Sequence, residues 1–330
     1  MLNDKTILVT GGTGSFGHEF IKKVLEDYKP KKVIVFSRDE FKQYQMQKRF
    51  SKWAKQMRYL LGDIRDEARL QRAFEGVDYV IHAAALKQVP ALEYNPMEAV
   101  KTNVIGAENI VSAALSQGVK KVITLSTDKA VNPVNLYGAT KLVAEKVFIA
   151  ANASGGGRTR FSAVRYGNVM GSRGSVIPLF VKFKNDGVTE FPITDDKMTR
   201  FWITLEQAVE LVMIAIKETE GGEVFVPDIP SMKVTDLAKA ILPKCTFNIT
   251  GIRPGEKLHE SLISSDESRS TKKVDGVYVV IPQFKVSDKT HDKYEKYDAV
   301  PEGFVFSSNL NKKWLSQEEL REMIGGMKFD

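Results

Sequence analysis

Short apolar runs alternate with longer amphipathic stretches through the first two-thirds of this chain. The runs are rich in Val and Ile and show little period-two alternation, which predicts strands that are buried on both faces. The amphipathic stretches have helical spacing, as at residues 16–27, 96–117 and 137–152. The predicted strands are residues 6–10, 32–36, 57–61, 79–83, 122–126 and 161–165. This alternation predicts an α/β fold with a doubly wound parallel sheet and helices on both faces.

The regular alternation of predicted strands and helices ends after Gly167. Loops lengthen at residues 171–178 and 191–200, and short strands join predicted helices at 205–219 and 234–242. The polar segment 264–296 contains a single apolar run, residues 277–282. We therefore predict one domain over residues 1–167, to which some later segments return. Residues 168–330 mainly form a second, smaller domain that lies over the sheet as a lid.

Composition narrows the class of protein. A chain of 330 residues, with 43% hydrophobic and 27% charged residues, is typical of a globular protein of about two domains. Cys245 is the single cysteine, which excludes an intrachain disulfide and a Cys-rich zinc site, and the four histidines lack metal-ligand spacing, so we expect no metal. Neither a signal peptide nor a membrane span is apparent, and we expect a soluble cytoplasmic protein.

The net charge of +7 is compatible with a solvated basic surface or with an anionic small-molecule ligand. Nucleic acid is the least favoured partner, because the Lys and Arg residues are dispersed and lack interleaved aromatic residues.

A glycine-rich turn follows the first predicted strand and opens the first helix. Glycine lets backbone N–H groups approach a pyrophosphate at a helix N-terminus, so this turn predicts a Rossmann-type dinucleotide site. The residues expected to surround the dinucleotide here are Gly11, Thr13, Gly14, Ser15, Phe16 and Gly17.

The end of the second strand predicts which dinucleotide binds. Ser37 and Arg38 stand where an NAD-selective site would place an acid, and Lys42 follows one turn later. A hydroxyl and a guanidinium suit a 2′-phosphate, so NADP is favoured over NAD. Asp39 and Glu40 also lie at this point and could dilute that preference.

Three further strand ends complete the predicted cofactor site. Asp63, followed by Ile64, could bind the adenine amino group or cap the next helix, and His82 is interpreted as a packed strand-end residue. Small residues after it let the backbone pass close to the cofactor. The other residues assigned to the cofactor are Ala83, Ala84, Ala85, Lys87 and Val169.

Two clusters carry candidate chemistry. Tyr137 and Lys141 are four residues apart and share one helix face, where the lysine charge is expected to lower the pKa of the tyrosine. Thr127, Asp128 and Lys129 place a hydroxyl, an acid and a base at the carboxyl end of the fifth strand, where open α/β sheets bind ligands. Either cluster could instead be structural, with Asp128 as a simple cap.

These residues lie in segments that resemble a known family over essentially the whole chain. The chain resembles extended short-chain dehydrogenase/reductases that act on nucleotide sugars, and among them the inverting UDP-N-acetylglucosamine 4,6-dehydratases. The segments that carry the resemblance are TGGTGSFG, FSRDE, GDIRD, HAAALKQVP, STDKAVNPVNLYGATK, RYGNVMGSRGSVIP, ITDDKMTRFWI and GIRPGEKLHE.

The resemblance implies a role for each candidate. Tyr137, helped by Lys141 and Thr127, would remove the C4 hydroxyl proton while NADP takes the C4 hydride. Lys129 would remove the C5 proton, for which its pKa must lie well below about 10.4. Asp128 would protonate the departing C6 hydroxyl, and hydride return to C6 would give an L-configured 4-keto-6-deoxy sugar, the first intermediate of pseudaminic acid.

The resemblance also implies a UDP-N-acetylglucosamine site and a homo-oligomer, either a dimer or a hexamer. Segment 172–178 would surround the uracil and phosphates, and Arg200 and Arg253 would grip the diphosphate and ribose. The residues assigned to the substrate are Lys87, Asn168, Ser175, Val176, Ile177, Pro178, Thr194, Arg200, Arg253 and Glu256.

Competing interpretations remain open. Most hexose 4,6-dehydratases carry Glu where Lys129 stands, and related capsule-pathway dehydratase/5-epimerases replace the tyrosine that is present here as Tyr137. A retaining dehydratase, a capsule-pathway enzyme and a 4-epimerase are the nearest alternatives. A non-catalytic NADP-binding regulator is the alternative from another class, although such proteins commonly lose the Tyr–Lys pair.

Overall fold

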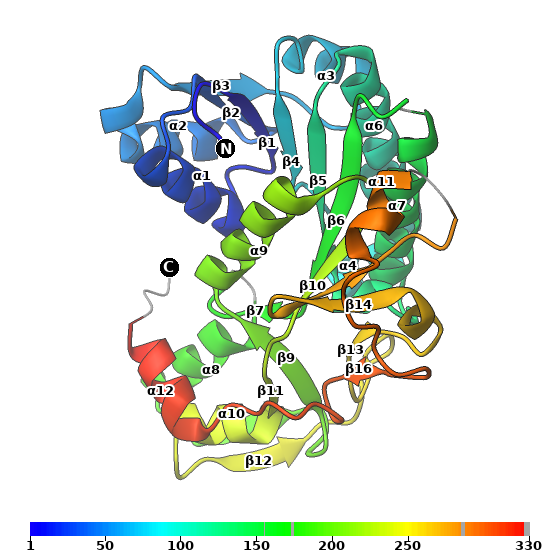
Figure 1. Ribbon diagram of the computed structural model, residues 1–330. Helices are drawn as coiled ribbons and strands as arrows, with labels where there is room; N and C mark the ends of the chain where they lie inside the picture. The colour runs from blue at the N-terminus through cyan, green and yellow to red at the C-terminus, as the bar shows by residue number, and fades with distance from the viewer. Residues whose placement is uncertain (155, 173–174, 285–287, 327–330) are drawn as a thin grey trace.

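A nine-stranded sheet runs through the centre of the molecule (Figure 1). The computed structural model describes residues 1–154, 156–172, 175–284 and 288–326. The strand order is β14-β15-β10-β6-β5-β4-β1-β2-β3, and the strands from β10 to β3 run parallel. The strands are β1 (Thr6–Thr10), β2 (Lys32–Ser37), β3 (Met57–Leu61), β4 (Tyr79–His82), β5 (Lys121–Thr127), β6 (Arg160–Tyr166), β10 (Val224–Pro227), β14 (Thr271–Val274) and β15 (Val277–Val280). This confirms the predicted α/β class.

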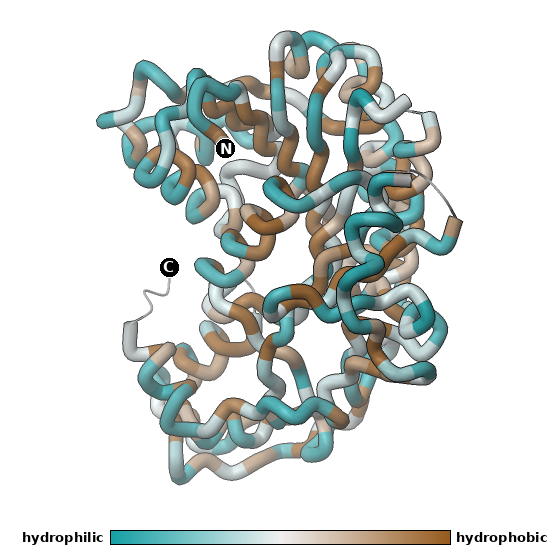
Figure 2. Tube along the Cα trace, viewed as in Figure 1, coloured by the Kyte–Doolittle hydropathy of each residue, from teal (hydrophilic) through white to brown (hydrophobic). Residues whose placement is uncertain are grey.

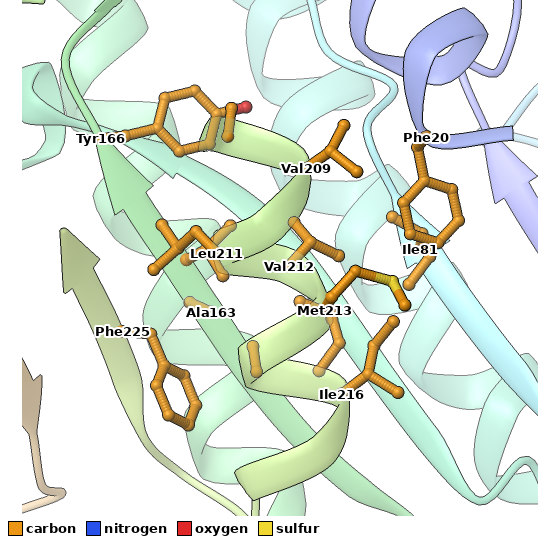
Figure 3. Close-up of a cluster of buried hydrophobic side chains, with 14 of the residues drawn as sticks. Phe20, Ile81, Ala163, Tyr166, Val209, Leu211, Val212, Met213, Ile216 and Phe225 are labelled. Atoms are coloured by element: carbon orange, nitrogen blue, oxygen red, sulfur yellow. The ribbon is translucent and has the colours of Figure 1, made fainter. Parts of the chain in front are cut away.

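Both faces of the sheet are covered by helices, which explains the lack of period-two alternation. In β1, Ile7 and Val9 face one apolar cluster and Leu8 faces the other. Helices α1 (Ser15–Asp27) and α9 (Leu205–Glu218) cover the first face. Figure 3 shows Val209, Val212 and Ile216 of α9 beside Phe20 and Ile81. Helices α3 (Glu67–Ala73), α6 (Gly106–Ser116) and α7 (Leu136–Ser154) cover the second face.

Strand β3 departs from the expectation that all strands are buried on both faces. Met57 is buried, but Arg58 and Leu61 are exposed. The reason is position, because β3 is the edge strand beside β2 and has no neighbour on its other side. The apolar run therefore predicted the strand correctly but not its place in the sheet.

The predicted helix at residues 96–117 is interrupted. It consists of α5 (Pro96–Ala99), the π-helical segment η2 (Val100–Ile105) and α6. The side chain of Asn103 in the π segment accepts from Leu86 N–H and donates to Leu86 O, both at 2.9 Å. A wider turn of this kind is common at functional sites, and here it anchors the loop after β4.

The last third of the chain does more than form a lid, because part of it extends the sheet. The apolar run at 277–282 forms β15, which pairs antiparallel with β10 and with β14. Asp275 and Gly276 have φ of 44° and 86°, the left-handed backbone of a tight hairpin. The two antiparallel strands modify the all-parallel sheet that the sequence predicted.

A separate layer lies beyond the carboxyl ends of the parallel strands. It holds a three-stranded sheet, β11-β9-β7, and the two-stranded pairs β12-β8 and β13-β16. Residues 191–200, predicted as a loop, contain the end of β8 and the start of β9. The strands are β7 (Asn168–Val169), β8 (Glu190–Ile193), β9 (Thr199–Ile203), β11 (Ser231–Lys233), β12 (Thr246–Ile249), β13 (Ser261–Ile263) and β16 (Phe306–Ser307).

Helices α8, α10 and α12 pack in this layer around a third apolar cluster that includes Trp202 and Leu237. Figure 2 shows brown, hydrophobic segments inside both layers and teal segments on the outside. The remaining helical elements are α2 (Glu40–Arg49), η1 (Ser51–Trp53), α4 (Val89–Tyr94), η3 (Asp128–Ala130), α8 (Val176–Asn185), α10 (Val234–Ile241), η4 (Asp266–Ser270), α11 (Asp288–Tyr294) and α12 (Gln317–Gly325).

Within the described part of the chain, every helix is too short or too polar to cross a membrane.

Candidate active site

A cavity of about 570 Å³ opens at the carboxyl ends of β1, β2, β4, β5 and β6. Nearly all residues predicted to bind the cofactor line it. They are Gly11, Thr13, Gly14, Ser15, Phe16, Gly17, Ser37, Arg38, Asp39, Lys42, Asp63, Ile64, Ala83, Ala84, Ala85, Lys87, Tyr137, Lys141 and Val169. Glu40 is the exception and lies outside the lining, because it is the first residue of α2.

The glycine turn leaves the start of α1 free for a ligand. Gly11 has φ of 66°, and a Cβ there would lie 2.8 Å from the backbone nitrogen of Ala84. Gly14, the N-cap of α1, has no side chain to cap the helix, and the first turn carries no acid. The first amides of α1 and its positive dipole end therefore suit a pyrophosphate.

The basic residues after β2 are only loosely held. Lys42 pairs with Asp39 at 3.0 Å, and Arg38 lies 3.5 Å from Asp63 with half of its side chain exposed. Arg65 binds the same Asp63 carboxylate at 2.7 Å. Partial burial acts to raise the pKa of Asp63, but hydrogen bonds from Arg65 hold it below its ordinary value. Asp63 is thus a charged acceptor that Arg65 already occupies.

His82 is a packing residue, as the sequence predicted. Its Nδ1 lies 2.8 Å from the Thr10 hydroxyl, and burial lowers the pKa of His82 to about 3. A neutral imidazole at the end of β4 leaves the proton chemistry to other groups.

The candidate acid and base lie side by side at the end of β5. The Lys129 ammonium donates to Asp128 Oδ1 at 3.0 Å, and the Thr127 hydroxyl donates to the same oxygen at 2.9 Å. Thr127 and Lys129 line the cavity, whereas Asp128 is fully buried beneath them. The second oxygen of Asp128, Oδ2, is buried and has no hydrogen-bond partner.

Glu260 is a carboxylate at this site that the sequence analysis did not single out. Its Oε1 lies 3.5 Å from Lys129 Nζ, and its Oε2 lies 3.7 Å from Lys257 Nζ. Glu260 is the last residue of the segment GIRPGEKLHE, so the segment was noticed while the contact was not. The pairing joins positions 131 residues apart, which no local pattern reveals.

The expected lowering of the Lys129 pKa is wrong for this structure. Burial acts to lower the pKa of Lys129, but the Asp128 and Glu260 carboxylates outweigh burial and Arg200, and the net pKa is raised. Burial and the neighbouring Lys129 instead lower the pKa of Lys87, which lines the same cavity.

Tyr137 and Lys141 share the inner face of α7. A Cβ at Gly138 would collide with the backbone oxygen of Lys129, so the start of α7 packs directly on η3. Burial lowers the pKa of Lys141 to about 8 against the opposing charge of Glu145.

The predicted lowering of the tyrosine pKa by Lys141 is also wrong, because the net pKa of Tyr137 is raised. Burial raises the pKa of Tyr137, and the groups that act to lower it are Lys129 and a hydrogen bond with Thr127, rather than Lys141. Tyr137 is therefore electrostatically linked to the Thr127–Lys129 cluster.

The predicted substrate residues divide into two groups. Asn168, Ser175 and Lys87 line the cavity. The others lie outside its lining; they are Val176, Ile177, Pro178, Thr194, Arg200, Arg253 and Glu256. Ile177 is buried in the third apolar cluster. Residues 173 and 174 of the predicted uracil loop lie outside the described residues.

The two arginines expected to grip the diphosphate differ in their partners. The buried Arg200 donates to the carbonyls of Thr199, Lys257 and Leu258 at 2.7 to 3.1 Å. Arg253 is exposed and lies 3.8 Å from Glu256. The guanidinium of Arg200 is thus occupied by backbone carbonyls, two of them in the segment GIRPGEKLHE. Arg253, in contrast, is free to reach a ligand.

No group of three or more His, Cys, Asp or Glu side chains in the described ranges could hold a metal ion.

Together, the parallel sheet, the open glycine turn and the facing Tyr–Lys pair define a Rossmann-type protein of the extended short-chain dehydrogenase/reductase class. More narrowly, the chain belongs to the family described as polysaccharide biosynthesis protein, whose profile matches residues 7–282.

Named relatives and a solved structure cover nearly the whole chain. The chain is 54% identical to a Campylobacter jejuni protein named UDP-N-acetylglucosamine 4,6-dehydratase (inverting), over 98% of each chain. It is 42% identical to a Rickettsia felis protein named UDP-glucose 4-epimerase, over 98% of this chain and 96% of the relative. The crystal structure of Pen from Bacillus thuringiensis is 40% identical, covers 98% of both chains and superposes with a TM-score of 0.89.

Proposed function

We propose that the protein dehydrates UDP-N-acetylglucosamine at C4–C6 and inverts C5. The product is UDP-2-acetamido-2,6-dideoxy-L-arabino-hex-4-ulose, which places the reaction as the first step of pseudaminic acid synthesis. The observation that carries the proposal is the contact of Lys129 with Asp128, in the same cavity that Tyr137 and the glycine turn line. The 54% identity to a protein named for this reaction supports it.

NADP is the proposed cofactor. The residues present fit it, because the α1 amides lack a cap, Gly11 leaves no room for a side chain, and Arg38 and Lys42 lie at the 2′ position. When bound in this cavity, NADP would supply reversible hydride transfer, from C4 and back to C6, so that no cofactor would be consumed. A guanidinium and an ammonium favour a 2′-phosphate by charge-assisted hydrogen bonds.

Tyr137 takes the proton of the C4 hydroxyl in this proposal. Lys141 holds the ribose hydroxyls from the same helix face, and Thr127 orients the tyrosine oxygen through their hydrogen bond. The positive charge that favours the tyrosinate comes from Lys129, which lies across the cavity mouth. The C4 ketone that results makes the C5 proton acidic, because the enolate places its charge on oxygen.

Lys129 and Asp128 carry out the elimination. Lys129 in its amine form removes the C5 proton, and the electron pair left at C5, which the C4 carbonyl stabilises as an enolate, expels the C6 hydroxyl as water. Asp128, which must be protonated at this step, supplies the proton to that leaving oxygen. The proton passes either directly or through the Thr127 hydroxyl, which in the resting structure donates to Asp128. Protonation of C5 from the opposite face then gives the L configuration.

The sugar nucleotide lies between the two layers in this proposal. Asn168, Ser175 and Lys87 contact it at the cavity, and the exposed Arg253 reaches its diphosphate. We keep the division into a cofactor-binding domain of residues 1–167 and a mainly substrate-binding domain of 168–330, and a homo-oligomeric assembly, as part of the same proposal.

A UDP-sugar 4-epimerase is the second candidate, because relatives at 41–42% identity carry that name. An epimerase needs Tyr137 and Lys141 but has no use for a base at C5. The buried cluster of Asp128, Lys129 and Glu260 favours the dehydratase.

Proton NMR of the product in deuterated water tests the proposal. Purified protein is given UDP-N-acetylglucosamine without added reductant. A C6 methyl group, a C4 ketone and deuterium at an inverted C5 are expected. A C4 epimer with an intact C6 hydroxymethyl group indicates the epimerase, a C6 methyl group with the D configuration kept at C5 indicates a retaining enzyme, and an unchanged substrate contradicts both.

A further inference from the structure

Glu260 is fixed in the structure so that its carboxylate faces Lys129. The backbone N–H of Glu260 donates to Ser308 Oγ at 3.0 Å, and Ser308 N–H donates to Glu260 O at 2.8 Å. This clamp holds the residue just before β13, with only 3% of its side chain exposed. The carboxylate therefore reaches Lys129 from the second layer, while Lys129 itself lies in η3, directly after β5 of the central sheet.

Glu260 does not line the cavity, so any effect on the reaction passes through Lys129. Its Oε1 lies 3.5 Å from Lys129 Nζ, an ion-pair distance, whereas Asp128 makes the closer hydrogen bond at 3.0 Å. Asp128 is already assigned to the proton that leaves with the C6 oxygen. Glu260 has no such task. Burial raises the pKa of Glu260, although the positive charges of Lys129, Arg200 and Lys257 act to lower it, so its carboxylate depends on these cations for its charge.

The other charged and titratable groups around Lys129 are Lys87, Arg200, Lys257 and Tyr137. Two of these cations also have other partners. Arg200 donates to three backbone carbonyls, and Lys257 donates to Val131 O while its Nζ lies 3.7 Å from Glu260 Oε2. Their positive charge acts to lower the pKa of Lys129, yet the two carboxylates outweigh it. Of the two carboxylates that raise the pKa of Lys129, Glu260 is therefore the one that can be changed without removing the proposed proton donor, Asp128.

We propose that Glu260 is a positioning residue that holds the Lys129 ammonium group in place and sets the pH at which Lys129 begins to act on C5. The inference rests on the function proposed above.

The chemistry gives Glu260 two opposite effects. Lys129 must lose one ammonium proton to solvent before its nitrogen forms the new N–H bond with the C5 proton, whose bonding electrons pass to the enolate. A nearby carboxylate delays that loss to higher pH, but it also makes the resulting amine a stronger base. Without the Glu260 carboxylate, the neutral amine of Lys129 should therefore form at lower pH. That amine should also be a weaker base than in the wild type.

The decisive measurement is deuterium exchange at C5 against pH. The NADP-loaded enzyme is given the purified 4-keto product in heavy water, and the rate is followed by NMR. For Glu260→Gln, the rising limb of the profile is expected at least about one pH unit below that of the wild type, with a lower plateau. Glu260→Asp retains the charge and is expected to return the limb toward the wild-type position.

Glu218→Gln is the matched control. Glu218 also pairs with a lysine, Lys293, at 2.8 Å, but at the far end of α9 from the cavity. Its profile is expected to coincide with that of the wild type. The proposal is overturned if the exchange rate of Glu260→Gln rises at the same pH as that of the wild type while the melting temperature is unchanged. It is also overturned if Glu218→Gln shows an equal shift.

A second measurement needs no substrate and separates this inference from the proposed reaction. Competitive acetylation with acetic anhydride, followed by mass spectrometry of the Lys129 peptide, reports the fraction of neutral amine at each pH. In Glu260→Gln this fraction is expected to rise at lower pH than in the wild type. If the wild type shows no C5 exchange, the proposed reaction fails, and the acetylation profile alone still supports or contradicts the role of Glu260.

Discussion

Lys129 in η3 and Lys141 in α7 line the same cavity, yet their surroundings shift their pKa values in opposite directions. Burial acts to lower both. At Lys129 the carboxylates of Asp128 and Glu260 reverse the effect. At Lys141 the nearest carboxylate, Glu145, is shared with the buried Arg165 and offsets burial only in part.

The difference teaches that the pKa of a buried lysine depends on how many carboxylates contact it and on how closely other cations pair with them. Glu145 is bound by Arg165 at 2.5 Å, whereas Glu260 lies 3.7 Å from Lys257. On that basis we expect Lys129 to serve the C5 step and Lys141 to serve the C4 step. The predictions below test this division.

The largest effect is expected for Lys129→Ala. The variant should still bind NADP and the UDP-sugar, but it should lose dehydration and C5 exchange by about 10²–10⁴-fold, the usual contribution of a general base. Product NMR and exchange into the 4-keto product in heavy water provide the measurement. Exchange near the wild-type rate removes Lys129 as the base and with it the main support for inversion.

Tyr137→Phe and Lys141→Ala are expected to fail at the other step. Both should show no transient NADPH absorbance with UDP-N-acetylglucosamine, because the C4 hydroxyl proton has no acceptor or the ribose is not held. Both should retain C5 exchange on the ready-made 4-keto product. If Lys141→Ala and Lys129→Ala lose the same step, the proposed division between the two lysines is wrong.

Replacement of the two lysines by methionine should change the free energy of unfolding in opposite directions. The pKa of Lys141 is about 8 in the folded protein and 10.5 in the reference state, so the folded protein gains stability as pH rises between these values. Lys141→Met should therefore be more stable than the wild type by up to about 3 kcal/mol below pH 8, and this advantage should vanish near pH 10.5.

Lys129→Met is the counterpart, and it should be less stable at neutral pH because two buried carboxylates lose their partner. Denaturant unfolding of the cofactor-free proteins at pH 7 and pH 10 measures both changes. A loss of stability in Lys141→Met at pH 7 would show that its ammonium group is better compensated than the structure indicates.

The smallest effect is expected outside both regions, at Arg38. Arg38→Asp should weaken NADP binding roughly tenfold or more, because a charge-assisted contact contributes about 1.5–3 kcal/mol. C5 exchange at saturating NADP should not change. Equal wild-type affinities for NAD and NADP, measured by calorimetry, would contradict the assignment of Arg38 to a 2′-phosphate.

Local patterns predicted the parts of the fold that local forces determine. Strands β1 and β3 begin and end at the predicted residues. In β1 every residue is buried, which leaves little choice of register. Strands β8 and β9 were missed within residues 191–200, because their partners β12 and β11 lie far along the chain. The glycine turn was found because its function requires glycine at fixed spacing.

The chemical details depended on contacts that no spacing encodes. The sequence placed Thr127, Asp128, Lys129, Tyr137 and Lys141 together, and apart from the buried Asp128 they line the cavity. It could not give the balance that raises the Lys129 pKa, because Glu260, which adds to the effect of the adjacent Asp128, comes from another layer. Arg200 was interpreted as a ligand for phosphate, but its guanidinium is occupied by backbone carbonyls.

The strand order has a consequence for synthesis of the chain. Strand β6 ends at Tyr166, but β10, which pairs with Ala163 and Val164, begins only at Val224. At ribosomal rates of 5–20 residues per second, the apolar edge of β6 waits roughly three to twelve seconds for its partner. An uncovered edge strand is a template for pairing with other chains. A chain truncated at residue 200 is therefore expected to aggregate, which a sedimentation assay would measure. The nascent protein thus passes through an interval in which a chaperone that covers the edge of β6 would protect it from aggregation.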